Sequence, residues 1–263
     1  MTVTASQVKE LRDMTGAGMM DCKRALQETG GDVEEARRLL REKGMASAGK
    51  REGRETTEGR VLERVEGDRG SIVAVGCETE PVSKNEDFIA FAERALELAF
   101  TEGPDALADL DEERVELVAR LGENIVLSAA ARMEAAEGER LAAYAHPPAN
   151  KIGVLVRARS SAELARMVAM HIAASRPQHT RREEVPADDI QREREIYEKL
   201  PEVGSKPEHI RPQIVEGMIA KRFFADSVLL DQPWIHDPAL TVGKAFSEHN
   251  AEVIEFVRYS VTE

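Results

Sequence analysis

Apolar residues recur at three- and four-residue intervals through the first 44 positions, and two glycine-containing turns interrupt them. Glycine can adopt the positive φ that ends a helix. Thr4 with Gln7, and Asp32 with Glu35, have the spacing of N-terminal capping boxes. The pattern predicts three helices in residues 1–44, the last ending at Gly44. Their predicted core consists of Val8, Leu11, Ala25, Leu26, Val33, Ala36 and Leu40.

Two adjacent methionines, Met19 and Met20, follow the first of these turns. In so small a bundle, at most one of two neighbouring side chains can point inward. The other would form an adaptable apolar surface for a partner. The alternative, in which both methionines serve as packing residues, stays open at this point.

Residues 45–60 contain small, charged and glycine residues with almost no apolar content, which predicts a linker between domains. Gly44 to Lys50 spells most of a phosphate-binding loop. Arg51 stands where the magnesium-binding Ser or Thr belongs, and a helix rather than a strand precedes the loop. The hypothesis of a hydrolase or a nucleotide-binding enzyme is supported by this 44–50 segment alone. The scattered histidines form no recognisable catalytic set, so we expect no enzyme, no cofactor and no metal site.

Apolar runs at 61–66 and 71–77, joined by the turn 67–70, predict a β-hairpin. A helix with Asn85 as its cap follows. A similar strand at 151–157 and a helix at 162–175 come later in the chain, with a further helix at 112–121 between the two copies. The sequence therefore predicts an α+β core of two β-β-α halves, at 61–145 and 146–263.

The second half carries an additional helical segment. Residues 188–200 have a helical pattern but are polar nearly all round, which is typical of a projecting helix. We expect a helical hairpin at about 187–221, whose second arm begins only near Pro212, because proline is tolerated in the first turn of a helix but not in its interior. A helix at 242–249 and an alternating strand at 253–261 are expected to close the chain.

The net charge of −13 is unevenly distributed. Residues 1–60 hold 12 basic and 11 acidic residues, and the rest hold 24 and 38, so the body of the protein is acidic. An acidic body repels phosphate backbones, and the short basic patch at Lys50, Arg51 and Arg54 is read as a solvated linker rather than a nucleic-acid site. Cys22 and Cys77 are read as small buried hydrophobes in a reducing, cytoplasmic location. No apolar run is long enough to suggest a membrane span.

Five separated segments closely resemble the bacterial elongation factor Ts family. They are V-K-E-L-R-D-M-T-G-A-G-M-M-D-C-K-R-A-L at 8–26, G-E-N-I at 122–125, M-H-I-A-A-S at 170–175, V-E-G at 215–217 and the T-V-G and E-H-N-A-E-V segments within 241–253. The resemblance implies a three-helix ubiquitin-associated-like domain, a linker and a two-part core with a helical hairpin. It also implies a nucleotide exchange factor that binds elongation factor Tu carrying GDP, promotes GDP release and is displaced when GTP binds.

In the family, a Thr-Asp-Phe-Val loop places an aromatic ring against the magnesium site of Tu. Here the matching residues are Thr79, Glu80, Pro81 and Val82. Glu80 keeps the carboxylate, but Pro81 removes the ring and its apolar area. Three alternatives remain open: the loop acts through its backbone, the partner has a complementary change, or the protein is a binding-only paralogue that stabilises or regulates Tu.

The resemblance also implies further contacts with Tu. Arg12, Met19 and Met20 match family residues that meet its nucleotide-binding domain, and His146 matches a family histidine in the second half. Ile235 and His236 lie where the family has an apolar pair against another Tu domain. No direct nucleic-acid or membrane partner is implied, and a homodimer or a 2:2 complex with Tu stays open.

Overall fold

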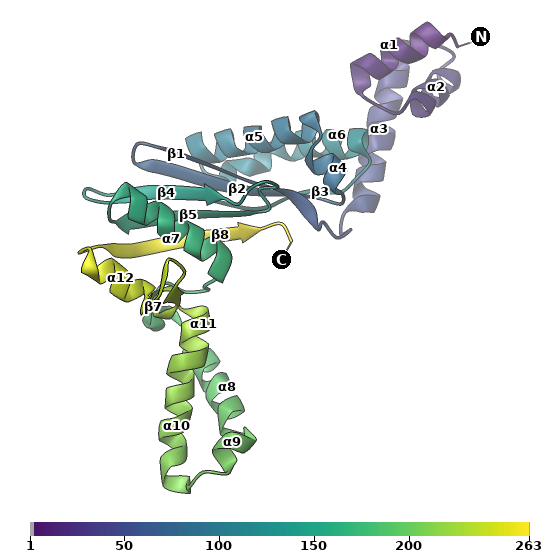
Figure 1. The fold of residues 1–263 in the computed structure, drawn as a ribbon. Coiled ribbons are helices and arrows are strands. Elements are labelled where there is room, and N and C mark those ends of the chain that lie inside the picture. The colour runs from purple at the N-terminus through teal and green to yellow at the C-terminus, as the bar shows by residue number, and fades with distance from the viewer. Residues whose placement is uncertain (1–2, 263) are drawn as a thin grey trace.

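The computed structural model describes residues 3–262, apart from the side chains at positions 45, 47 and 48. Its N-terminal module contains α1 (Ala5–Thr15), α2 (Met19–Glu28) and the first part of α3 (Val33–Arg51), shown in purple in Figure 1. The predicted capping box of Thr4 and Gln7 is confirmed, and Gly16 ends α1 with a φ of 66°. The buried core residues of this module are Val8, Leu11, Cys22, Ala25, Leu26 and Ala36.

The predicted end of the third helix at Gly44 is wrong, because α3 continues to Arg51. The linker expected at 45–60 is correspondingly shorter, since β1 already begins at Glu58. A Cβ atom on Gly44 would lie 2.4 Å from the Cβ of Ala119. Gly44 therefore allows α3 to cross closely against α6 (Asp111–Leu121) and does not end the helix. The 44–50 segment that resembles a phosphate-binding loop is helical instead.

The first half of the core is a three-stranded antiparallel sheet in the order β1-β2-β3. Its strands are β1 (Glu58–Glu66), β2 (Arg69–Cys77) and β3 (Ile125–Glu134). Between β2 and β3 lie α4 (Glu80–Ser83), α5 (Glu86–Thr101), a 3-10 helix (Pro104–Leu110) and α6 (Asp111–Leu121). Helices α5 and α6 cover the outer face of this sheet, where Phe88, Phe91 and Leu117 pack against Val75 and Ile125.

The second half repeats this plan, with sheet order β4-β5-β8. Its strands are β4 (Arg140–Ala145), β5 (Ile152–Arg159) and β8 (Glu252–Ser260). Helices α7 (Ala162–Ser175) and α12 (Val242–Glu248) cover its outer face. Each half is therefore β-β-α-β and not β-β-α. The expected boundary at 145/146 is also wrong, because β4 pairs with β5 and so belongs to the second half. The remaining division into domains stays a prediction.

The inner faces of the two sheets stack on each other. Their shared core contains Val61, Ile72, Ala74 and Met133 from the first sheet and Leu141 and Leu155 from the second, together with Val261. Glycine at the second position of each middle strand allows the close approach: Gly70 faces Leu155, and Gly153 faces Ile72. The two halves thus interlock in an approximately two-fold manner.

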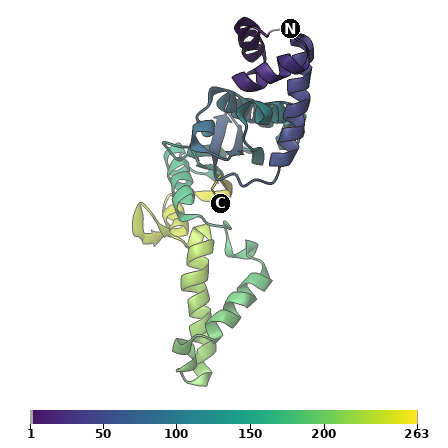
Figure 2. The ribbon, with the colours of Figure 1, turned by 90° about the vertical axis from the view of Figure 1, so that its right-hand side faces the viewer.

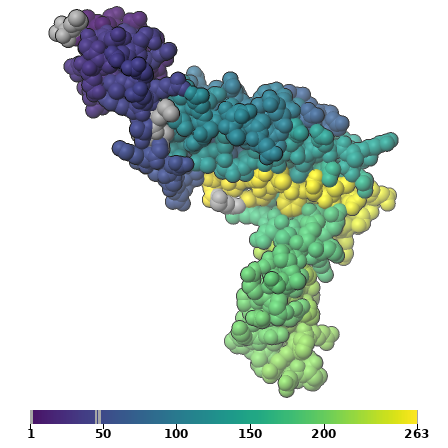
Figure 3. Space-filling model, turned by 180° about the vertical axis from the view of Figure 1, so that it is seen from behind, coloured from purple at the N-terminus to yellow at the C-terminus, as the bar shows by residue number. Residues whose placement is uncertain are grey.

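The helical hairpin projects away from the stacked sheets, opposite the N-terminal module (Figures 1, 2 and 3). Its first arm is α8 (Ala187–Glu198), followed by α9 (Pro201–Gly204) and a 3-10 turn (Glu208–Ile210). The second arm begins with α10 (Arg211–Met218), with Pro212 in its first turn as predicted. It continues through a π-helical segment (Ile219–Phe224) into α11 (Ala225–Ser227).

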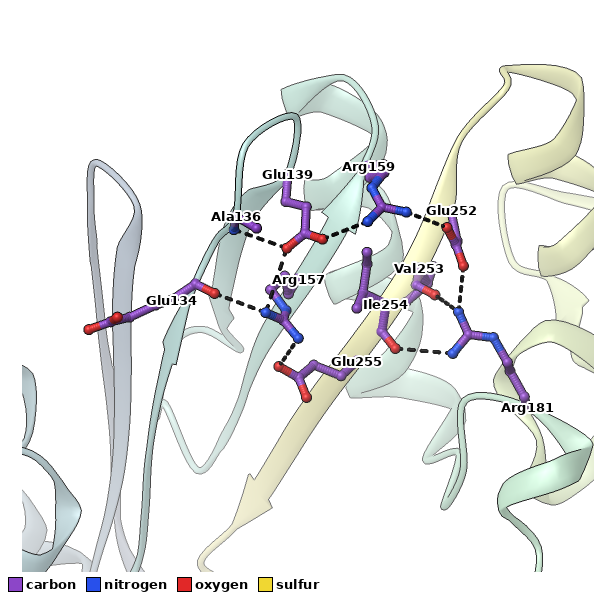
Figure 4. A network of polar contacts seen from close by, with 10 residues as sticks. All are labelled: Glu134, Ala136, Glu139, Arg157, Arg159, Arg181, Glu252, Val253, Ile254 and Glu255. Carbon is purple, nitrogen blue, oxygen red and sulfur yellow. Dashed lines mark hydrogen bonds and ion pairs between the residues drawn. The ribbon is translucent and has the colours of Figure 1, made fainter.

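A polar network secures the base of the hairpin to the second sheet (Figure 4). Arg181, just before the hairpin, pairs with Glu252 at 2.8 Å and donates hydrogen bonds to the β8 carbonyls of Val253 and Ile254. Arg159 on β5 links Glu252 to Glu139, whose side chain is only 5% exposed. Several charged groups share partners here, so the network fixes an orientation that one exposed ion pair would not.

Substitution of Gly153 by Ala tests the stacking of the two sheets. The new Cβ would lie 2.4 Å from Val61 Cγ1, so we expect the free energy of unfolding to fall. Overpacking of this kind costs about 1–3 kcal/mol. Urea denaturation followed by the fluorescence of Trp234, the single tryptophan, measures the change. Gly217→Ala, whose Cβ would meet open space, is the matched control and should lose no stability. Equal stability of Gly153→Ala and wild type would contradict the interlocked packing.

Candidate functional site

The 79–82 loop lies between the end of β2 at Cys77 and the start of α5 at Glu86. Thr79 occupies the N-cap position of α4, and Pro81 lies in the first turn of this short helix, where its missing N–H group costs nothing. Thr79, Glu80 and Pro81 are exposed, while Val82 is half-buried against the first sheet's outer core. The loop therefore presents a polar and a small apolar side chain to solvent at one end of the sheet. The helix α4 itself was missed by the sequence analysis.

Two carboxylates from neighbouring turns hold this loop in place. The backbone N–H of Thr79 donates to Glu123 Oε2 at 3.0 Å, and its hydroxyl donates to Glu123 Oε1 at 2.5 Å. In the opposite direction, the N–H of Asn124 donates to Glu78 Oε1 at 2.6 Å. Glu123 and Asn124 belong to the G-E-N-I segment that the sequence analysis quoted without assigning a role to either residue.

The thiol of Cys77, immediately before the loop, is buried. Burial raises its pKa to about 12, and the nearby Glu123 carboxylate contributes in the same direction. The thiol therefore stays protonated and has little nucleophilic character. Cys22 is also buried, and burial raises its pKa as well. Both cysteines are small buried hydrophobes, as predicted.

Glu80 pairs with Lys84 one turn later on the same loop and helix, at 2.7 Å. The hydrogen bond from Lys84 lowers the pKa of the Glu80 carboxyl, which is ionised at neutral pH. Both side chains are more than half exposed, so this pair is screened by solvent and contributes little to stability. Its consequence is local: it turns the carboxylate toward Lys84.

His146 lies at the same end of the stacked sheets as the loop. The turn that contains it reaches β1, because Asn150 accepts a backbone hydrogen bond from Val61, and Lys151 pairs with Glu58 at 2.6 Å. Glu58 is the register partner of Cys77, which directly precedes the loop. His146 is exposed and its Nδ1 lies 2.9 Å from the hydroxyl of Tyr144. The fold thus brings the two predicted contacts to one end of the core.

Ile235 and His236 lie in a turn between the short strands β6 (Pro233–Trp234) and β7 (Asp237–Thr241). Both side chains are exposed, and the ring of His236 lies 4.7 Å from that of Trp234. Arg12, Met19 and Met20 are exposed on the N-terminal module, with Met19 at 53% and Met20 at 62%. The alternative in which both methionines are packing residues is therefore wrong.

A buried histidine that the sequence analysis gave no role supports the β6–β7 turn. His171 on α7 is fully buried and its ring lies 5.2 Å from that of Trp234. The amide of Gln232 donates to two backbone carbonyls, so its oxygen must accept from His171 Nε2, at 2.9 Å. His171 Nδ1 then accepts the N–H of Ile235 at 3.4 Å. This arrangement requires the neutral imidazole, and its only sequence signal was a histidine on an apolar helix face.

Within residues 3–262, no group of three or more His, Cys, Asp or Glu side chains is arranged to hold a metal ion. In the same range, no helix is both long enough and apolar enough to cross a membrane.

Comparison with known proteins identifies the family. A family model described as "Elongation factor TS" matches residues 78–263. The protein named "Elongation factor Ts" from Methylococcus capsulatus is 41% identical over all of this chain and 93% of its own length. The protein of the same name from Thioalkalivibrio sulfidiphilus is 43% identical with the same coverage, and that from Cronobacter sakazakii is 41% identical over 99% of this chain and 92% of its own.

The chain belongs to the elongation factor Ts family. This membership is consistent with the α+β fold and its N-terminal helices, and it places the chain among translation elongation factors. The 79–82 loop of this elongation factor Ts family member carries Pro81 in the first turn of the four-residue helix α4. Two contacts depend on the tertiary structure and are displayed by no single motif: the hydrogen bonds from Thr79 to Glu123, and the hydrogen bond from the N–H of Ile235 to His171.

The neutral state of His171 predicts a pH dependence of stability. Burial lowers the pKa of His171 in the folded protein below the ordinary value of 6.5. Between the two values the unfolded chain binds more protons, so the free energy of unfolding should fall as the pH drops below 6.5. We expect urea denaturation at pH 5.5 and 7.5 (a window of about one unit on each side of an unperturbed histidine) to show this loss. His171→Gln should flatten it, and an unchanged slope in that variant would contradict the assignment.

Proposed function

We propose that this protein is a guanine nucleotide exchange factor for elongation factor Tu. It binds Tu carrying GDP, promotes the release of GDP by disturbing the magnesium and phosphate site, and is displaced when GTP binds. No covalent bond is made or broken. The proposal rests on family membership together with one structural observation: the 79–82 loop is exposed at its tip and fixed at its base.

A loop of this kind suits the proposed action. Exchange requires that the factor bind the open, nucleotide-poor form of its partner more tightly than the closed form. An exposed tip can enter a neighbouring site, whereas the hydrogen bonds at Thr79 limit its freedom to retreat. Because the loop is ordered before binding, less interaction energy is lost in ordering it on contact.

The same coupling makes the exchange reversible. A factor that weakens GDP binding by a given ratio is itself bound more weakly by the same ratio when nucleotide is present. GTP binding can therefore displace the factor without any chemical step. This supports a non-enzymatic role, in which the factor changes rates and populations only.

The N-terminal module supplies a second contact in this proposal. Met19 and Met20 are exposed and flexible in shape, which suits an apolar partner face. The module is connected to the core by the continuous helix α3, and Arg41 on α3 pairs with Glu112 and Glu116 on α6. Two contacts held by one rigid connection reinforce each other, because binding at one raises the effective concentration of the other.

Release of labelled GDP from purified Tu tests the proposal directly. We expect wild-type protein to accelerate release in a concentration-dependent manner. The variant Met19→Ala, Met20→Ala should need at least about ten times more protein for the same rate, because burial of even one methionine side chain at an interface is worth about 1.5–3 kcal/mol and about 1.4 kcal/mol corresponds to a factor of ten. Ile196→Ala, an equally exposed apolar residue on the hairpin, is the control and should behave as wild type. If added wild-type protein leaves the rate of GDP release from Tu unchanged, the proposed exchange function is wrong.

Pro81 favours a second candidate, a family member that binds Tu as a stabilising or regulatory partner with weak exchange. Pro81 is exposed, and it is small where the family loop carries an aromatic ring. A ring would add about 150–250 Å² of apolar surface for burial in the partner. Under this candidate, binding to Tu persists while the maximal release rate stays low.

The double substitution Glu80→Asp, Pro81→Phe separates the two candidates. Residue 81 is exposed, so the ring fits without a clash in the free protein. Under the second candidate, the maximal GDP release rate should rise about tenfold, which corresponds to about 1.4 kcal/mol of added preference for the open partner. Glu80→Asp alone is the control for the shortened carboxylate. If the double variant and wild type share the same rate, the missing ring does not limit exchange, which counts against the second candidate.

A further inference from the structure

The position of the 79–82 loop depends on groups outside it. Glu80 and Pro81 are exposed and Val82 is only half-buried, so apolar burial contributes little to holding the tip. The loop's own hydrogen bonds, such as that from the Ser83 hydroxyl to the carbonyl of Glu80, shape α4 but do not orient it against the core. At its far end, Arg60 on β1 donates to the carbonyl of Ser83 at 2.7 Å.

The near end of the loop is held by Glu123. Thr79 occupies the N-cap position of α4, where a threonine hydroxyl ordinarily accepts a hydrogen bond from the first turn. In this protein it makes no such bond. The hydroxyl and the N–H of Thr79 instead both donate to the two oxygens of Glu123. Thr79 therefore bonds to a residue 44 positions away in the sequence and not to the first turn of its own helix.

The location of Glu123 makes this contact firm. Gly122, with a φ of 79°, ends α6 and turns the chain directly into β3. Asn124, only 4% exposed, is bound on both sides: its N–H donates to Glu78, and its side-chain amide donates to the carbonyl of Arg54 at 2.8 Å. Residues 78 and 79 are therefore bound reciprocally to residues 123 and 124, and both pairs lie at the end of the first sheet.

We propose that Glu123 is a positioning residue for nucleotide exchange. Its carboxylate holds Thr79 in one orientation. Glu80 and Pro81 are therefore presented to the partner in a conformation that the loop already has before binding. This inference rests on the proposed function and deepens it. Without the carboxylate, the loop populates several orientations, and the activity at a given concentration falls with the fraction that remains competent.

Three variants test this role in the full-length protein. Glu123→Ala removes both acceptors, and we expect the GDP release rate at subsaturating protein to fall about tenfold, with little change in the melting temperature. Glu123→Gln keeps one acceptor for the N–H and offers a donor to the Thr79 oxygen, so it should restore most of the rate. Glu137→Ala, an exposed glutamate in the turn between β3 and β4, is the matched control and should equal wild type.

A double-mutant cycle with Thr79→Val identifies the contact itself. The valine keeps the shape of threonine but lacks the hydroxyl. We expect it to slow release in the wild-type background and to add almost nothing in the Glu123→Ala background, because the interaction is already gone. Additive effects of the two substitutions would overturn the proposal. Equal impairment of Glu123→Ala and Glu123→Gln would also overturn it, since a charge effect and not positioning would then be responsible.

Amide hydrogen exchange in the free protein separates this inference from the proposed function. The amide of Thr79 should exchange slowly in wild type and in Glu123→Gln, and much faster in Glu123→Ala. Unchanged protection of the Thr79 amide in Glu123→Ala would contradict the proposal that Glu123 orders the loop, whatever the GDP release rates show. Wild-type protein could fail to accelerate GDP release while the protection of Thr79 behaves as expected. That result would contradict the exchange role of Glu123 and Thr79, but it would support the contact by which Glu123 orders the loop.

Discussion

The stacking of two three-stranded sheets is the constraint on which the rest of this protein depends. The inner faces meet through Ile72, Leu155 and their neighbours. Gly70 and Gly153 permit the approach, because a Cβ there would lie 2.9 Å from Leu155 Cδ1 and 2.4 Å from Val61 Cγ1, respectively. Each middle strand is buried on both faces, which accounts for the almost unbroken apolar runs of β2 and β5. The stacked core leaves the strand ends as the places where functional loops can be displayed.

The segments that carry the predicted contact residues are attached to this core at different points. The 79–82 loop follows β2, the turn containing His146 joins β4 to β5, and the β6–β7 turn rests on the buried His171 of α7. The N-terminal module and the helical hairpin extend in opposite directions (Figure 3). Such an elongated outline exposes more surface than a compact core of the same length would, which is consistent with the proposed binding of a large partner.

Local rules accounted for much of the secondary structure. The capping box at Thr4, the cap at Asn85 and the first-turn position of Pro212 were predicted because each depends on residues within one turn. The errors occurred where a distant contact decided the outcome. Gly44 predicts a helix end, but it lies inside α3, where the absence of a Cβ makes room for Ala119 on another helix. Strand β4 was missed because its alanines carry a weak signal until β5 pairs with it.

The candidate site divides in the same way. The sequence by itself determined the family and the α+β class, because these depend on residue identity and order, whereas the contact role of the 79–82 loop stays a prediction. Only the tertiary structure decided what holds the 79–82 loop and the β6–β7 turn. Glu123 meets Thr79 across 44 positions of sequence, and His171 meets Gln232 across 61. Hydrogen bonds of this kind depend on how the sheets and helices close in space, which no local pattern of residues encodes.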